Sequence, residues 1–359
     1  MMWMGEIATK SRIYLDHAAT TPARAEAIAA MVEAAAIVGN PSSVHAGGRA
    51  ANAIIERARD ILAAWAGCQA DAIIFTSGGS EALALALNTP LRVLAGATEH
   101  SAVLSARPDA VLIAVDRRGL IDLDELDRAL AAGPALVAIQ HANNETGVIQ
   151  PIAEIGERVA AAGGRLLVDA VQSAGKLPLP SADYIAISAH KLGGTPGTGA
   201  LIARDADSLV AVQRGGQERG LRGGTPNLPG IAAFAAAIDA PADWTATAAL
   251  RDALEARIGT TAHGADTPRL PHIGNFALPG VASGVQVMTL DLAGFMVSAG
   301  AACSSGRVAA SHVLAAMGLG AAAGQSIRVS LGPETTAAEV DAFAHAWLAM
   351  AARLARVAA

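Results

Sequence analysis

The chain has 359 residues, which is long enough to bury a large core and to form two domains rather than one. Its formal net charge is −6, it contains no run of Lys and Arg, and aromatic residues make up only 3% of it, so the composition argues against nucleic-acid binding. No apolar run approaches the length that spans a bilayer, and the N-terminus Met-Met-Trp-Met-Gly-Glu lacks a signal-peptide pattern, so we expect no membrane contact and a cytoplasmic location.

The first two thirds of the chain alternate predicted helices with short apolar strands. Such alternation is typical of a mostly parallel sheet with helices on both faces, so the pattern predicts an α/β fold. A polar motif, Tyr14 to Pro22, precedes the first helix. The expected helices lie at residues 23–38, 48–66, 80–87, 122–131 and 151–162, and the expected strands at 73–75, 92–95, 112–115, 136–140, 165–169 and 184–187.

A glycine turn, Gly78-Gly79-Ser80, joins the strand at 73–75 to the following helix. Free N–H groups and the positive end of the helix dipole make such a turn a candidate phosphate site. It is no Walker A loop, because no Gly-Lys-Ser/Thr follows, and taken alone it could simply connect a strand to a helix.

Polar residues follow two further strands. His100 comes soon after the strand at 92–95, where it could stack over a flat ring, shuttle protons or merely cap the next segment. A dense polar loop, His141 to Gly147, follows the strand at 136–140. Because parallel strands place their carboxyl ends on one edge of a sheet, these residues are expected to lie near each other.

Two neighbouring strands end in Asp169 and in Ser188-Ala-His-Lys191. Lys191 could be a surface lysine in a glycine-rich loop. At a buried strand end, however, desolvation would favour its neutral amine, which forms Schiff bases with carbonyl compounds. Pyridoxal phosphate (PLP) needs a lysine for its aldehyde and a carboxylate for its ring nitrogen, so the pair predicts a PLP site.

The C-terminal third has a different pattern. Residues 215–226 are rich in glycine and charge and predict an exposed, ordered loop, and the composition shifts at 240–243, our expected domain boundary. Arg328 lies in an alternating strand with Ile327 and Val329 on the other face, where it could grip a carboxylate or form a surface ion pair. Strands are expected at 274–278, 295–298 and 326–331, and helices at 284–292 and 337–356.

The chain has two cysteines, Cys68 and Cys303, and their spacing indicates neither a disulfide framework nor a metal site. Cys303 lies in Ser298-Ala-Gly-Ala-Ala-Cys-Ser-Ser-Gly306, among Gly, Ala and Ser. Access and mobility in such a run fit a nucleophile better than a core residue.

Taken together these motifs resemble the cysteine desulfurases of the NifS/IscS type, in the class V aminotransferase group with PLP fold type I. The resemblance runs from Tyr14 to Gly332. It implies a mostly parallel mixed sheet flanked by helices, with a large PLP-binding domain at 14–240 and a smaller α+β domain, made of 1–13 and 241–359, that carries the cysteine loop. Its most specific pieces are His141-Ala-Asn-Asn-Glu-Thr-Gly, Val168-Asp-Ala-Val-Gln-Ser-Ala-Gly-Lys, Ser188-Ala-His-Lys and the segment around Cys303.

The resemblance also implies roles for single residues. Lys191 would carry the cofactor as a Schiff base, His100 would stack on its ring and transfer protons, and Cys303 would accept sulfur. No metal is implied. The remaining roles are Asp169 on the pyridinium nitrogen, Gln172 near the ring hydroxyl, Gly79, Ser80, Ser188 and His190 on the phosphate, Thr225 from the second subunit of a homodimer, and Asn144 and Arg328 on the substrate carboxylate.

The implied activity is conversion of L-cysteine to L-alanine, with a persulfide left on Cys303 for a sulfur-acceptor protein in Fe–S cluster, thio-cofactor or tRNA biosynthesis. A thiol of ordinary pKa, about 8.5, is mostly protonated at neutral pH. We therefore expect a proton acceptor near it, and His100 is the first candidate. The alternatives are another class V PLP enzyme that does not use Cys303, such as a selenocysteine lyase or an aminotransferase, and a PLP-free scaffold protein.

The chain also departs from the family pattern. His17 stands where the family usually has Asn, and Gly79-Ser80 replaces the commoner Ala-Thr; either change could alter cofactor affinity. The cysteine segment has fewer serines than usual, and no scaffold-docking extension follows the last helix. The sulfur acceptor, the need for an activator and the preference for cysteine over selenocysteine are left open.

Overall fold

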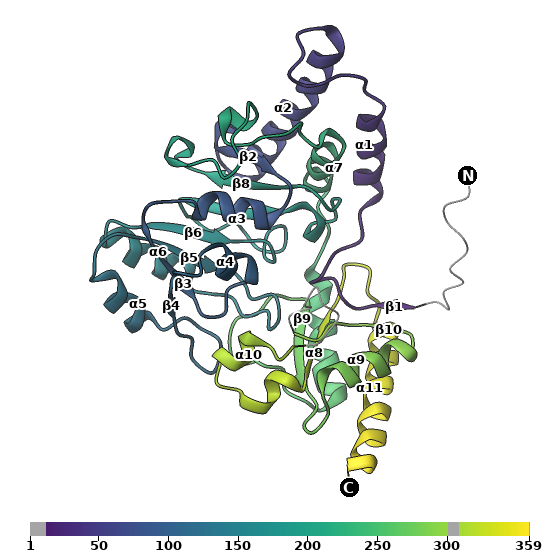
Figure 1. Cartoon of the computed structure of the whole chain (residues 1–359). Coiled ribbons are helices and arrows are strands. Elements are labelled where there is room, and N and C mark those ends of the chain that lie inside the picture. Colours follow the sequence, from purple (N-terminus) through teal and green to yellow (C-terminus); the bar gives the residue numbers. More distant parts are fainter. Residues whose placement is uncertain (1–11, 301–308, 359) are drawn as a thin grey trace.

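The structure is a computed structural model that describes residues 12–300 and 309–358 (Figure 1). Its centre is a seven-stranded sheet with the order β2-β8-β7-β6-β5-β3-β4. The strands are β2 (Ile73–Thr76), β3 (Arg92–Gly96), β4 (Val111–Ile113), β5 (Ala135–Gln140), β6 (Arg165–Asp169), β7 (Tyr184–Ser188) and β8 (Gly199–Ala203).

Five neighbouring strands of this sheet, from β4 to β7, are parallel, and β8 runs antiparallel to both β7 and β2. In register, Gln140 is opposite Asp169, which is opposite Ala186, so β5, β6 and β7 end close together. The expected mostly parallel, mixed sheet is confirmed. The sequence pattern did not predict β8, whose five residues are all buried.

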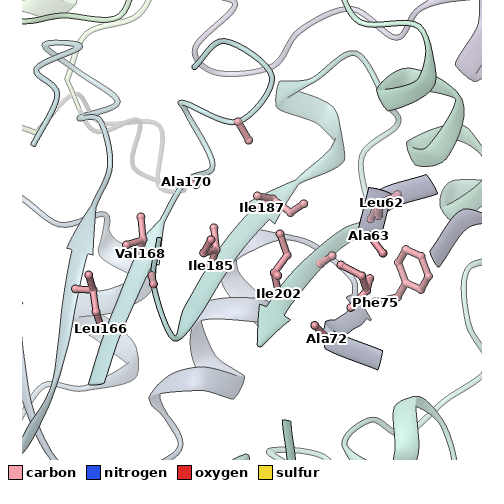
Figure 2. Close-up of a cluster of buried hydrophobic side chains, with 14 of the residues drawn as sticks. Leu62, Ala63, Ala72, Phe75, Leu166, Val168, Ala170, Ile185, Ile187 and Ile202 are labelled. Carbon is pink, nitrogen blue, oxygen red and sulfur yellow. The ribbon is translucent and has the colours of Figure 1, made fainter. Parts of the chain in front are cut away.

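Helices cover both faces of the sheet because successive side chains of each strand point to opposite sides. Val137 and Ile139 pack with one set of helices, α2, α5, α6 and α7, and Leu136 and Ala138 with α3 and α4. Figure 2 shows part of the first cluster, with Val168 and Ile185 on adjacent strands. The helices are α1 (Ala25–Ala35), α2 (Ala46–Ala66), α3 (Gly79–Leu87), α4 (Ser101–Ala106), α5 (Leu123–Leu130), α6 (Ile152–Ala161) and α7 (Leu228–Asp239).

The C-terminal part has its own core, below the main sheet in Figure 1. It contains Phe276, Phe343 and Trp347, and Leu15 joins it from the start of the chain. Two small sheets pair β1 (Ile13–Tyr14) with β10 (Phe295–Met296) and β9 (Ile273–Ala277) with β11 (Ser326–Ser330). The helices here are α8 (Thr245–Ile258), α9 (Ser283–Leu292), α10 (His312–Ala316) and α11 (Ala337–Ala358).

The main differences from the sequence-based expectation are the unpredicted helices α4, α8 and α10. α8 buries only Thr247, Leu254 and Ile258, so its sequence carries little apolar periodicity. α4 and α10 are shorter than two turns and depend on caps. Ser311 caps α10 by accepting a hydrogen bond from the Leu314 N–H at 3.0 Å.

The loop at 215–226 is held to the sheet by one carboxylate. Glu218 accepts two hydrogen bonds from the Arg59 guanidinium and one from the Phe75 N–H, each 3.0 Å long. The side chains of Glu218 and Arg59 are only 5% and 14% exposed. Glu218 and Arg219 adopt positive φ, 47° and 57°, which costs a non-glycine residue energy that these charge-assisted bonds offset.

We expect Glu218→Gln to lower the free energy of unfolding by about 3 kcal/mol, because it leaves the Arg59 charge without its buried partner. Urea unfolding measures this. Asp109→Asn is the matched control, since it makes the same carboxylate-to-amide change in the exposed pair with Arg107 and should leave the urea midpoint nearly unchanged. Equal shifts in both variants would contradict a buried anchor.

Candidate active site

A cavity of about 390 Å³ opens at the edge where β5, β6 and β7 end. Residues from the α3 N-terminus, from the loops after four strands and from the C-terminal part all line it. It lies where ligands of open α/β sheets are expected to bind. Ten of the predicted site residues line it together: Gly79, Ser80, His100, Asn144, Asp169, Gln172, Ser188, His190, Lys191 and Arg328.

Two predicted site residues are not among the lining residues. Thr225 is exposed in the loop at 215–226, away from the cavity of its own chain. Thr225 is predicted to contact the phosphate bound by a second subunit, and a single chain does not test this contact, so the role of Thr225 stays a prediction. Cys303 lies outside the described residues.

Lys191 ends a short turn after β7, with its ammonium group directed at the motif near the start of the chain. Its Nζ donates to the main-chain oxygens of Ala18 and Ala19, the latter at 2.7 Å. Burial, and then the charge of Arg328, lower the Lys191 pKa to about 8. A larger share of neutral amine is therefore present near neutral pH than for a solvated lysine, as a carbonyl nucleophile requires.

Asp169 is the last residue of β6 and is 8% exposed. Its Oδ1 accepts a hydrogen bond from the Val171 N–H at 2.9 Å. Burial raises the pKa of this carboxyl group, and the charges of His100 and Lys191 counteract the rise. A cationic N–H placed against Asp169 would favour the ionised form of its carboxyl group. The protonated ring nitrogen of PLP is such an N–H.

Gln172 offers a direct test of whether PLP fits. Its Nε2 donates to the Ala18 oxygen at 2.9 Å, while its Oε1 is buried without a hydrogen-bond partner among the described residues. Such an acceptor costs free energy unless a ligand satisfies it. Because Gln172 and Asp169 line the same cavity, a ring hydroxyl of bound PLP would be a suitable donor for this oxygen.

The other end of the cavity suits a phosphate. Gly79 begins α3, and a Cβ at this position would lie 2.6 Å from the Val171 Cγ2, so an alanine here would require the Val171 side chain to shift. Burial, then Lys191 and Lys176, lower the pKa of His190 to about 4, which leaves a neutral donor. With Ser188, Ser80 and the N–H groups of α3, these residues form an anion cradle, and the site as a whole fits PLP.

His100 caps the next helix and also lines the cavity, so its predicted stacking and proton-transfer roles stay predictions. Its Nδ1 caps α4 by accepting a hydrogen bond from the Ala102 N–H at 3.1 Å, and its ring lines the cavity. Burial is the main reason that its pKa is lowered, with Lys191 and His312 adding to the effect. The shift favours the neutral imidazole.

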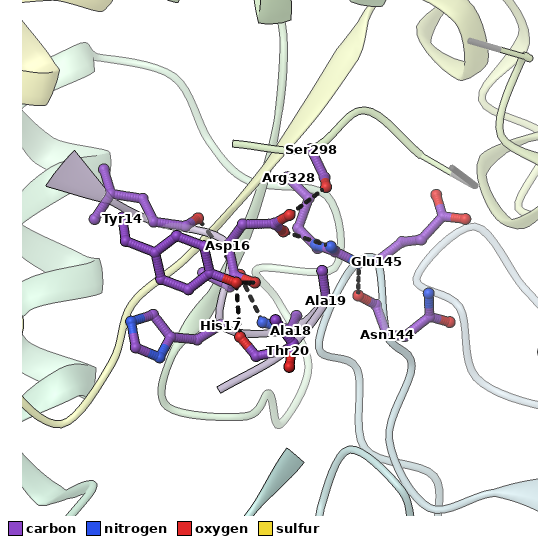
Figure 3. A network of polar contacts seen from close by, with 12 residues as sticks. Tyr14, Asp16, His17, Ala18, Ala19, Thr20, Asn144, Glu145, Ser298 and Arg328 are labelled. Atoms are coloured by element: carbon purple, nitrogen blue, oxygen red, sulfur yellow. Dashed lines mark hydrogen bonds and ion pairs between the residues drawn. The ribbon is translucent and has the colours of Figure 1, made fainter. Parts of the chain in front are cut away.

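Arg328 is buried at the cavity wall rather than in a surface ion pair (Figure 3). Its guanidinium donates to the Asp16 Oδ1 at 2.7 Å and to the Asn144 main-chain oxygen at 2.9 Å. Its Nε is buried with no partner within residues 12–300 and 309–358. The Asp16 Oδ2 accepts from the Ser298 hydroxyl at 2.7 Å, so the Asp16 carboxylate links Arg328 to Ser298.

The sequence reasoning missed Asp16, Glu145 and His312. Glu145 and His312 line the cavity, and the Ser311 hydroxyl donates to the Glu145 Oε2 at 2.6 Å. Asp16 lies in the polar motif Tyr14 to Pro22, and Glu145 lies in the polar loop His141 to Gly147. Their place in these motifs could have indicated that they belong to the site. His312 carried no such signal, because it starts a five-residue helix.

His17, the residue that departs from the family pattern, does not line the cavity. Its ring packs against Tyr14 at 4.9 Å between centroids, and a side chain at Gly332 would overlap it. The substitution therefore alters packing behind the motif, while the main chain of Ala18 and Ala19 still faces Lys191.

Within residues 12–300 and 309–358, no group of three or more His, Cys, Asp or Glu side chains could hold a metal ion. Nor does any helix within those residues combine the length and the apolar character that crossing a membrane requires.

The family model described as aminotransferase class-V matches residues 13–343. Among curated proteins, the chain is 40% identical to a cysteine desulfurase of Frankia sp. (strain EuIK1), covering 91% of this chain and 88% of the relative. It is 36% identical to the putative cysteine desulfurase IscS 1 of Bacillus subtilis, over 92% of this chain and 96% of the relative.

Solved structures agree with the sequence comparison. The NifS-like protein of Rickettsia africae ESF-5 superposes with a TM-score of 0.87 at 31% identity, over 94% of this chain and 98% of that one. A structure titled SspA in complex with cysteine superposes with a TM-score of 0.79 at 29% identity, over 90% of this chain and 100% of that one.

Proposed function

The chain belongs to the aminotransferase class-V family, and from this premise we propose that it is a PLP-dependent cysteine desulfurase. It would convert L-cysteine to L-alanine and pass the sulfur to its own thiol. The observation that carries the proposal is the meeting of Lys191, Asp169 and Arg328 in one cavity. An amine, a carboxylate and a guanidinium are the groups that an amino-acid-binding PLP enzyme needs. The names of the curated relatives support L-cysteine as the substrate.

When bound, PLP supplies an aldehyde for the substrate amine and a ring that withdraws electrons from the substrate Cα. Lys191 would hold the cofactor covalently, and its amine, with a pKa of about 8, would remove the Cα proton. Asp169 would keep the ring nitrogen protonated. The Gln172 Oε1 would accept from the ring hydroxyl, and Gly79, Ser80, Ser188 and His190 would hold the phosphate.

Arg328 and Asn144 would bind the substrate carboxylate. The Arg328 Nε, which has no partner among the described residues, is the donor still available, while Asp16 fixes the guanidinium plane. Sulfur transfer to Cys303 then replaces one S–H bond and one C–S bond by an S–S bond and a C–H bond. One proton leaves a thiol and one reaches Cβ, so the site must contain an acceptor and a donor.

The remaining assignments extend the family comparison. The enzyme would be a cytoplasmic homodimer in which Thr225 of one subunit completes the phosphate site of the other, consistent with the exposed side chain of Thr225 in an anchored loop. A large domain would span 14–240, and 1–13 with 241–359 would form the smaller one. A sulfur-acceptor protein, for Fe–S cluster or thio-cofactor synthesis, would take the persulfide.

The purified protein tests the proposal. We expect visible-range absorption from bound PLP, a spectral change on adding L-cysteine, and alanine and sulfide in equal amounts when a thiol reductant is present. A keto acid in place of alanine would indicate an aminotransferase. Turnover of selenocysteine but not of cysteine would indicate a lyase, and protein without visible absorption would favour a scaffold.

A further inference from the structure

Arg222 is a charged residue of the loop at 215–226 to which the mechanism above gives no role. Its Nε donates to the Glu81 Oε1 at 2.7 Å, and its second contact, from Nη2 to the Glu81 Oε2, is 3.4 Å long. Glu81 is the third residue of α3 and directly follows Ser80, which lines the cavity. The ion pair therefore lies beside the anion cradle, although neither of its members lines the cavity.

Glu81 also shapes the glycine turn before α3. Its Oε2 accepts a hydrogen bond from the Ser77 N–H at 2.6 Å, so the carboxylate closes the turn that leads from β2 into the helix. A Glu at the third position of a helix commonly reaches back in this way to the residues that start it. Burial alone would raise the Glu81 pKa, but the hydrogen bonds from Arg222 and Ser77 outweigh burial and hold this pKa below its ordinary value. Glu81 is therefore a carboxylate at neutral pH.

The loop holds Arg222 in place through its main chain. The Gln217 N–H donates to the Arg222 oxygen at 3.1 Å, and the Arg222 N–H donates to the Gln217 oxygen at 3.2 Å. The next residue, Glu218, accepts from the Phe75 N–H. The loop thus contacts the chain on both sides of the glycine turn, at Phe75 and at Glu81. The side chains of Arg222 and Glu81 are 21% and 32% exposed, so solvent screens their attraction only in part.

The charge of Glu81 lies at a helix end that also suits a phosphate. The N–H groups and the dipole of α3 favour an anion at Gly79 and Ser80. A carboxylate in the same helical turn would repel that anion if it had no cationic partner. Arg222 offsets the repulsion and leaves the Glu81 Oε2 bonded to the Ser77 N–H.

We propose that Arg222 is a positioning residue for the cofactor phosphate. It neutralises Glu81 and holds this carboxylate against the Ser77 N–H, so that the glycine turn keeps its shape without repelling the anion. The inference deepens the proposed function and rests on it, because the phosphate site at Gly79 and Ser80 is part of that proposal. It gives the loop at 215–226 a role within its own subunit, separate from the predicted contact of Thr225 with a second subunit.

A double-mutant cycle tests the charge balance. The probes are pyridoxine 5′-phosphate, which has no aldehyde and cannot react with Lys191, and pyridoxine, which lacks the phosphate. Calorimetry measures the binding of each to the apoprotein. Arg222→Gln should weaken binding of pyridoxine 5′-phosphate about tenfold at low ionic strength and leave pyridoxine binding unchanged. The loss should shrink as salt is added. Glu81→Gln, whose amide oxygen can still accept from the Ser77 N–H, should restore wild-type affinity in the Arg222→Gln background.

Arg118→Gln is the matched control, since it makes the same change in the exposed pair with Asp116, and it should alter neither binding constant. Weaker pyridoxine binding by Arg222→Gln, or a double variant that binds the phosphate ester no better than Arg222→Gln alone, would overturn the inference, because the pair would then only stabilise the fold. The proposed function fails separately. Wild-type protein that binds pyridoxine 5′-phosphate but forms no alanine from L-cysteine would contradict the desulfurase, while the cycle would still decide the role of Arg222.

Discussion

Replacing Lys191 with alanine is expected to abolish alanine formation from L-cysteine, with a loss on the order of 10³-fold or more. The variant would lose both the covalent attachment of PLP and the base that removes the Cα proton. Borohydride reduction followed by mass spectrometry measures the attachment directly. Wild-type protein should gain the mass of reduced PLP on the peptide that contains Lys191, and Lys191→Ala should not.

Lys176 provides the control, because the chain has only three lysines, Lys10, Lys176 and Lys191. Burial lowers the pKa of Lys176 to about 7, below that of Lys191, yet Lys176 does not line the cavity. Its ammonium donates to the Lys191 main-chain oxygen at 3.0 Å and lies 4.7 Å from the Trp244 ring centroid. An adduct on Lys176 would mean that amine basicity, rather than placement, selects the site.

The pH dependence of cofactor uptake follows from the same residue. In the proposed function the neutral amine of Lys191 is the nucleophile, so uptake of PLP by the apoprotein should accelerate as pH rises and level off above a pKa of about 8.

The sequence predicted the sheet and most of the cavity because the signals are local. β5 and β6 are continuous apolar runs buried on both faces, and the residues that follow them are polar. Once the strands are parallel and in register, Asp169 and Lys191 must meet at one edge. The glycine turn before α3 is equally local.

What the sequence could not predict depends on contacts between distant segments. The Asp16–Arg328 pair joins residues 312 positions apart, and the sequence around either residue does not indicate that the other is its partner. The reversal at β8 is set by pairing with β2 and β7, not by its own five residues. The hydrogen bond between the His312 ring and the Glu99 main-chain oxygen likewise joins groups that only the fold brings together.

Replacing Cys303 with alanine is expected to reduce alanine and sulfide formation by a factor on the order of 10³ or more, because the chain's other cysteine, Cys68, does not line the cavity and cannot take the sulfur. Arg328 and Asn144, which are proposed to bind the substrate carboxylate, and the amine of Lys191 remain. PLP absorption and the spectral change on adding L-cysteine should therefore persist, so the variant would bind its substrate without completing turnover.

Cys68→Ala is the matched control. Cys68 follows α2, packs against the core and does not line the cavity, and burial, followed by the charge of Asp71, raises its pKa. A half-buried thiol with a raised pKa is a poor nucleophile, so removing it should leave alanine formation unchanged. If Cys303→Ala still released sulfide and Lys191→Ala did not, the result would support PLP chemistry but contradict a persulfide on Cys303. The enzyme would then be a lyase that eliminates sulfur without an acceptor thiol, because Lys191, Asp169 and Arg328 would suffice for the reaction.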